Sequence, residues 1–168
     1  MANIRMAYRA TAIRTAVGLQ PTQRTSRQAA CMATNGSTRI QATRFGPSRV
    51  LDTRKFGWND TTWEGLQLDD LVLYELHVGT FSNEGTFDGA IGHLREVKEL
   101  GVTAVEVMPI ATFPGMRGWG YDGVDLWAVH DDYGGPAALQ RFVDACHARG
   151  LGVALDVVHN HAGASGNY

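Results

Sequence analysis

The sequence predicts an α/β fold built on a parallel sheet, and two features of the pattern predict it. Short β-rich apolar runs alternate with segments whose apolar residues recur every three or four positions. The order is strand, helix, strand, helix, strand, and the strand runs are apolar on both faces. Such runs are typical of parallel strands joined by right-handed helical crossovers. With 168 residues, the chain has room for about one domain.

The first three elements are predicted between residues 71 and 108. Residues 71–78 form an apolar, β-rich run that predicts the first strand. Thr86 is a suitable N-cap for a helix over residues 87–100, which Gly101 would end. The second strand is predicted over residues 102–108. The helix would bury one face, made by Phe87, Ile91, Leu94, Val97 and Leu100.

A long loop, residues 109–134, is expected before the second helix. That helix would begin near Pro136, which suits a first turn, and would end at Gly150. Its apolar face includes Cys146, which we therefore expect to be a core residue. The third strand is predicted over residues 153–158.

The strand-to-helix loops decide between a doubly wound sheet and a barrel. The loop after the first strand lacks the Gly-x-Gly-x-x-Gly pattern of dinucleotide-binding folds, and the chain has no phosphate-binding loop motif. The long second loop carries aromatic and acidic residues instead, as barrel enzymes do in the loops that build their sites. The sequence thus predicts the first three strands and two helices of a (β/α)₈ barrel, preceded by an irregular or disordered N-terminal segment.

Charge and composition divide the chain into parts. Residues 1–51 hold eight Arg and no Asp or Glu, whereas all seventeen acids follow residue 51. We expect a basic, disordered leader over residues 1–45, a lead-in loop over 46–70 that packs onto the domain, and a partial catalytic barrel over 71–168. The leader could be an unrelated segment, an organelle transit peptide, or a weak nucleic-acid contact.

Composition also limits the partners and the compartment. Only two aromatic residues, Tyr8 and Phe45, accompany the Arg of the leader, too few for a single-strand binding surface, so no nucleic-acid partner is expected. No run of eighteen apolar residues occurs, so no membrane span is expected. The chain has only two Cys, and they are far apart in the sequence. This count excludes a disulfide framework and favours a reducing, cytoplasmic compartment.

Polar residues appear abruptly where the third strand ends, over residues 156–161. Asp156, Asn160 and His161 would lie at the rim of the sheet, either as site residues or as an ordinary polar turn. A metal site is not expected, because His159 and His161 would point to opposite sides of a continuing strand and no His-Glu-x-x-His helix occurs.

Two aromatic residues in the long loop are further candidates. Trp119 and Tyr121 stand between glycines, which let a backbone approach a ligand closely. Their flat faces could stack on sugars or bases, or they could simply anchor the loop. His77, within the first strand, could be a packed core residue or a site residue.

Residues 156–161 (Asp-Val-Val-His-Asn-His) resemble the first signature region of the α-amylase superfamily of glycoside hydrolases. Within that superfamily, residues 74–81, 119–123 and 133–136 resemble the malto-oligosyltrehalose trehalohydrolases, and residues 46–50 and 56–58 resemble their lead-in. The resemblance covers residues 46–168. Alternatives are a fragment of a glucan branching enzyme, or a noncatalytic carbohydrate-binding remnant.

The resemblance implies cleavage of maltooligosyl trehalose with release of trehalose, an oligosaccharide as the partner, and no cofactor. It implies that Tyr121 stacks on the sugar before the cleaved bond, with Trp119 also in the substrate-binding surface. It implies that Asp156 orients an Arg near the nucleophile, that His161 hydrogen-bonds the same sugar, and that Asn160 supports the loop.

The resemblance also implies which residues the chain lacks. Retaining glycosidases use two carboxyl groups about 5–5.5 Å apart. In this superfamily they follow strands 4 and 5, so the nucleophile and general acid are expected beyond Tyr168. No catalytic residue is therefore expected within the chain, and the chain alone is expected to be inactive.

Overall fold

The structure, a computed structural model, describes residues 55–164. The predicted leader, residues 1–45, and the first part of the predicted lead-in, residues 46–54, lie outside this range, so the predicted domain division stays a prediction. The elements are η3 (Leu68–Asp70), β1 (Leu73–Leu76), α3 (Val78–Phe81), α4 (Phe87–Ile91), α5 (Leu94–Glu99), β2 (Ala104–Val107), β3 (Ala111–Thr112), β4 (Asp125–Val129), η4 (Asp131–Tyr133), α6 (Gly135–His147) and β5 (Gly152–Leu155).

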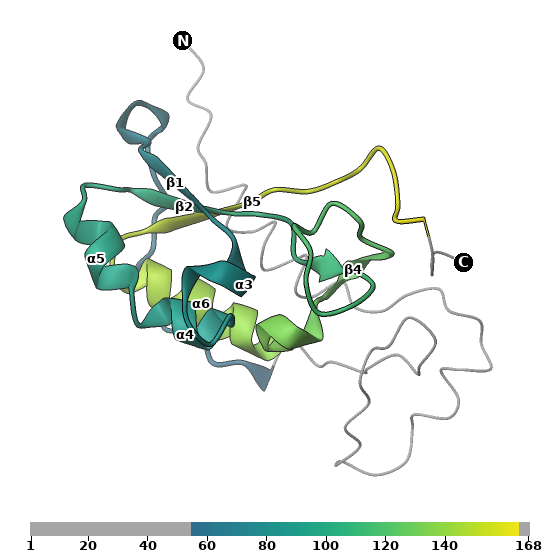
Figure 1. The fold of residues 1–168 in the computed structure, drawn as a ribbon. Coiled ribbons are helices and arrows are strands. Elements are labelled where there is room, and N and C mark those ends of the chain that lie inside the picture. The colour runs from purple at the N-terminus through teal and green to yellow at the C-terminus, as the bar shows by residue number, and fades with distance from the viewer. Residues whose placement is uncertain (1–54, 165–168) are drawn as a thin grey trace.

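Three strands form a parallel sheet in the order β1-β2-β5, and these are the three strands that the sequence predicts. Leu73, Ala104 and Gly152 are aligned across the sheet, so the strands begin at the same level. The helices lie on one side of this sheet (Figure 1), where α6 contacts β5 and α4 packs on α6. The α/β class with a parallel sheet is confirmed.

The two faces of the sheet differ in chemistry. Successive side chains of a strand point to opposite faces. The helix-covered face carries the core, with Val105 and Val107 fully buried. On the other face Glu75 and Glu106 are aligned side by side. The expectation of strands that are apolar on both faces is therefore wrong for this open face. Its other residues on β2 and β5 are small, namely Ala104, Gly152 and Ala154.

The first predicted helix is divided into α4 and α5. The hydroxyl of Thr86 accepts a hydrogen bond from the Gly89 amide at 3.1 Å, so the predicted N-cap is confirmed. The helix tightens at Gly92, whose amide donates to the Gly89 carbonyl three residues earlier at 3.2 Å. Glycine weakens a helix interior, which explains the break at this position. Gly101 has a φ of 86°, the left-handed conformation expected where a helix ends.

The long predicted loop contains an antiparallel hairpin, and the loop assignment is wrong there. Strands β3 and β4 pair with a register shift between Ala111 and Thr112. The Thr112 hydroxyl donates to the Ala128 carbonyl at 3.2 Å and joins the strands where regular pairing is interrupted. A second difference concerns Val78, which lies in the short helix α3 rather than in β1.

The lead-in packs against the start of the sheet in its described part. The Nδ1 of His147, at the end of α6, lies 2.8 Å from a carboxylate oxygen of Asp60, and each side chain is 1% exposed. The Trp63 ring stacks on the His147 ring at 4.6 Å, and Leu66 covers Gly152 at the beginning of β5. Cys146 is buried as predicted, and burial raises the pKa of its thiol.

Candidate functional site

The candidate site residues meet at the carboxyl ends of the parallel strands. Two loops build the site, residues 113–124 after β3 and residues 156–164 after β5. The Asp156 amide donates to the Val107 carbonyl at 2.9 Å, which continues the sheet pairing by one residue and fixes where the second loop starts. All five residues that the sequence singled out for substrate binding lie on these two loops: Trp119, Tyr121, Asp156, Asn160 and His161.

The first loop presents its two aromatic side chains outward. Trp119 is 72% exposed and Tyr121 is 39% exposed. Gly120 between them has a φ of 90°, and a Cβ there would overlap the Pro109 carbonyl. Only glycine satisfies both conditions, so the close approach at Gly120 determines where its two aromatic neighbours stand.

Tyr121 is joined to the second loop by a side-chain hydrogen bond. Its hydroxyl donates to a carboxylate oxygen of Asp156 at 2.9 Å. This hydrogen bond raises the pKa of Tyr121, with smaller contributions from burial and from the charge of Asp156. The phenol therefore keeps its proton at neutral pH and holds Asp156 at the rim of the sheet.

His161 also contacts the first loop, through its backbone. The Nε2 of His161 lies 2.9 Å from the Tyr121 carbonyl oxygen, and its Nδ1 lies 3.0 Å from the Asn160 side-chain oxygen Oδ1. Both partner oxygens can only accept, so each ring nitrogen is the donor in the hydrogen bond that it makes. His161 and Asp156 thus hold the two ends of Tyr121, the backbone and the hydroxyl.

A backbone contact completes the joining of the two loops. The Gly163 amide donates to the Gly123 carbonyl at 2.8 Å. A Cβ on Gly163 would overlap the Asp122 carbonyl, so the loops approach too closely for any other residue. The sequence did not single out Gly163, although a glycine two residues after the polar cluster was the available signal.

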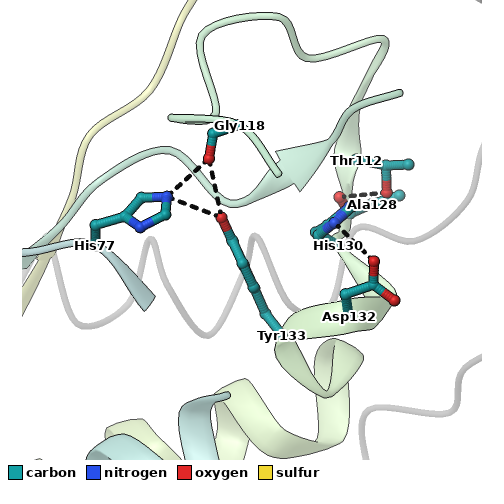
Figure 2. Close-up of polar contacts among 7 residues, drawn as sticks. All are labelled: His77, Thr112, Gly118, Ala128, His130, Asp132 and Tyr133. Carbon is teal, nitrogen blue, oxygen red and sulfur yellow. Dashed lines mark hydrogen bonds and ion pairs between the residues drawn. The ribbon is translucent and has the colours of Figure 1, made fainter. Parts of the chain in front are cut away.

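A further cluster lies beneath the first loop and was only partly anticipated. The Nε2 of His77 lies 2.8 Å from the Gly118 carbonyl, and the Tyr133 hydroxyl lies 3.0 Å from the same nitrogen (Figure 2). The sequence left His77 open between core and site, and it gave no role to Tyr133. These two residues contact the loop backbone one residue before Trp119.

Within residues 55–164, no group of three His, Cys, Asp or Glu side chains is arranged to hold a metal ion. None of the helices that the structure describes is long and apolar enough to cross a membrane.

The sheet, its helical layer and the joined loops agree with the sequence comparisons. The profile of the alpha-amylase catalytic domain matches residues 44–168. The chain therefore belongs to the alpha-amylase family of glycoside hydrolases.

Among curated proteins, the chain is similar to malto-oligosyltrehalose trehalohydrolases. It is 58% identical over 120 residues to that of Arthrobacter ramosus, which covers 71% of this chain and 21% of the relative. It is 51% identical over 132 residues to the trehalohydrolase of Saccharolobus solfataricus, and this match covers 76% of this chain and 24% of the relative. The 1,4-alpha-glucan branching enzyme of Vibrio cholerae is 37% identical over 127 residues, covering 68% and 17%. The chain thus spans about a fifth of the length of its trehalohydrolase relatives.

Solved structures give the same family. A Salmonella typhimurium protein described as an alpha amylase matches with a TM-score of 0.74 and 52% identity, over 76% of this chain and 22% of that one. An alpha-amylase from Geobacillus thermoleovorans, solved with acarbose, matches with a TM-score of 0.53 and 31% identity. This match covers 57% of this chain and 24% of that one.

Proposed function

We propose that residues 71–168 are the first part of a (β/α)₈ catalytic barrel in a hydrolase that releases trehalose from maltooligosyl trehalose. The identity of 58% to the Arthrobacter ramosus trehalohydrolase, against 37% to the Vibrio cholerae branching enzyme, favours this substrate over branching of a glucan. The observation that carries the proposal is the joined pair of loops, because it places an exposed aromatic surface beside a carboxylate at the carboxyl ends of parallel strands.

In this proposal Tyr121 supplies the face that stacks on a glucose ring. Its hydrogen bond to Asp156 fixes the position of the hydroxyl end of the ring, and the residue stays 39% exposed and within reach of a ligand. Trp119 offers a second, more exposed ring one step along the loop. Flat, apolar rings with restricted freedom bind the apolar faces of sugars at low entropic cost.

Asp156 has a second role in the proposal, as the partner of an arginine near the nucleophile. One of its oxygens accepts from Tyr121, which leaves acceptor capacity on the carboxylate for a guanidinium. His161 would hydrogen-bond the sugar that stacks on Tyr121, and Asn160 would set the ring angle of His161. The nucleophile and general acid belong to later strands of the barrel in this proposal, so the chain by itself is inactive.

A hybrid enzyme tests the proposal. The 120 matching residues of the Arthrobacter ramosus trehalohydrolase are replaced by those of this chain, and release of trehalose from maltooligosyl trehalose is measured. We expect the hybrid to release trehalose and the 168-residue chain to release none. A hybrid that transfers glucan branches without releasing trehalose would favour the branching reaction, and release by the chain alone would contradict its inactivity.

A further inference from the structure

We propose that His77 and Tyr133 are positioning residues that hold the Gly118 carbonyl and thereby set the position of Trp119 and Tyr121. We refer to His77, Tyr133 and Gly118 as the loop clamp. The effect of the clamp on sugar binding rests on the proposed function, because the two aromatic rings are the proposed sugar-binding surface. The clamp itself follows from contacts across three separate parts of the chain.

The contacts come from the end of β1, from η4 and from the first site loop (Figure 2). His77 Nε2 lies 2.8 Å from the Gly118 oxygen, and the Tyr133 hydroxyl lies 3.4 Å from that oxygen. The two rings are nearly perpendicular, at 89°, with centroids 5.9 Å apart. A Cβ on Gly79 would lie 3.0 Å from the Tyr133 ring and 3.1 Å from the His77 ring, so Gly79 leaves the space in which both rings fit.

The donors and acceptors of the clamp are consistent with one arrangement of protons. The Gly118 oxygen can only accept, so His77 Nε2 carries a proton and donates it. His77 Nδ1 lies 3.1 Å from the Thr80 hydroxyl and can accept from it. Burial raises the pKa of Tyr133, so its hydroxyl keeps its proton and donates to the same carbonyl.

Gly118 is also held from its other side. A Cβ on Gly118 would lie 2.9 Å from the Phe113 ring, and that ring stacks on His130 with centroids 3.8 Å apart. The Gly118 peptide is therefore enclosed between two hydrogen-bond donors and an aromatic surface. Trp119 follows directly, and Gly120 meets Pro109 immediately after it.

This arrangement limits how the aromatic rings can move. Trp119 is the single residue between the clamp at Gly118 and the close approach at Gly120, so its backbone is held on both sides. Without the clamp, the backbone before Trp119 loses its two side-chain donors. Tyr133 is also a core residue, so only a substitution that keeps its ring confines the loss to the loop.

Three variants remove or restore the donors. Tyr133→Phe removes one hydroxyl and keeps the ring that packs near Phe87 and Phe113. His77→Leu removes the second donor, and His77→Gln restores an N–H at a similar reach. Tyr74→Phe is the matched control, because it removes a β1 tyrosine hydroxyl outside the clamp.

The first measurement is fluorine NMR of the 168-residue chain with its four tryptophans labelled as 5-fluorotryptophan. Trp119→Phe assigns the Trp119 resonance. We expect Tyr133→Phe and His77→Leu to shift or broaden that resonance while the Trp58 and Trp63 resonances stay in place. Tyr74→Phe and His77→Gln should leave it close to its original position.

The second measurement uses the hybrid enzyme. Tyr133→Phe and His77→Leu are each expected to lower kcat/KM by about fivefold, the range for loss of one net hydrogen bond. His77→Gln should recover most of the lost kcat/KM. If His77 had only a structural role, this substitution would give no such recovery. An unmoved Trp119 resonance in both variants would overturn the clamp, as would a joint shift of all tryptophan resonances. An inactive hybrid would count against the proposed function, while the Trp119 resonance would still decide the clamp.

Discussion

The two ends of the parallel sheet are built in different ways. At the end where the strands begin, the lead-in packs through buried side chains, with Asp60 and His147 paired at 2.8 Å and each 1% exposed. At the end where the strands finish, the loops are held largely through backbone carbonyls, and Trp119 and Tyr121 stay exposed.

The difference shows how stability and ligand contact are separated along the strands. Apolar side chains gain stability by leaving water, and buried polar groups are tolerated when they are paired, but neither can then meet a ligand. Loops held through their carbonyls keep their side-chain faces available. Barrel enzymes use the two ends of their strands in this way. Substitutions at the first end should therefore change the free energy of unfolding, and those at the second end should change substrate turnover.

The largest effect is expected at the buried pair. Asp60→Ala removes the carboxylate that contacts His147 and should lower the free energy of unfolding by about 1–3 kcal/mol. Urea unfolding followed by tryptophan fluorescence measures this. Asp69→Ala, at an exposed acid of η3, is the control and should change stability by less than about 0.5 kcal/mol. Equal losses in both variants would contradict the assignment of stability to the pair.

Substitution at the opposite end should change activity instead. In the hybrid enzyme, Tyr121→Ala removes the stacking ring and Asp156→Asn removes a charge, and each should lower kcat/KM by about 10²-fold. Tyr121→Phe, which keeps the ring and loses only the hydrogen bond, should lose less. Urea unfolding of the same variants should be nearly unchanged. Full activity in both Tyr121→Ala and Asp156→Asn would rule out the proposed roles.

A smaller effect is expected at a helix end in the covered layer. Thr86→Ala removes the cap on the Gly89 amide and should lower the free energy of unfolding by about 1 kcal/mol. Thr86→Ser keeps the hydroxyl and serves as the control. Neither variant should move the Trp119 resonance, and a shift there would show that the two ends are coupled.

The smallest expected effect depends on pH and involves His130, whose ring stacks on Phe113 beside the first site loop. Burial lowers the pKa of His130 from its ordinary value of 6.5, and the nearby Asp132 and Asp131 oppose this. The unfolded chain therefore binds the proton more readily, so stability is present above pH 6.5 and is lost as the pH falls below it.

Comparison of urea midpoints at pH 7.5 and 5.5 checks this prediction. The wild-type chain should lose more stability on acidification than His130→Phe, while His93→Gln, at an exposed histidine, should behave as the wild type. An identical loss in all three would show that other groups cause the pH dependence.

Much of the fold could be predicted because its signals are local. The three parallel strands, the Thr86 cap and the burial of Cys146 follow from apolar runs and caps within a few residues. The break between α4 and α5 could not, because the apolar period continues across Gly92. The hairpin was missed because β3 has two residues and its pairing is irregular.

The candidate site was predicted in part for the same reason. Asp156 and Tyr121 were identified by a strand end, a glycine-flanked loop and a family resemblance, but their hydrogen bond joins residues 35 apart. Tyr133 was missed because its contact with His77 spans 56 residues and only the fold brings them together. The pairing of Asp60 with His147 spans 87 residues and had no local signal.

The sheet order β1-β2-β5 gives the molecule two unlike edges. Within residues 55–164, the outer edges of β1 and β5 pair with no other strand. The β5 edge of one copy can pair with the β1 edge of the next in the existing parallel direction, and each addition then exposes another β5 edge. Such growth is directional and has no closing step. A twofold pairing of two β5 edges differs, because it must be antiparallel and stops at a dimer. We therefore expect the sedimenting mass of the 168-residue chain to rise with concentration without a plateau at two copies.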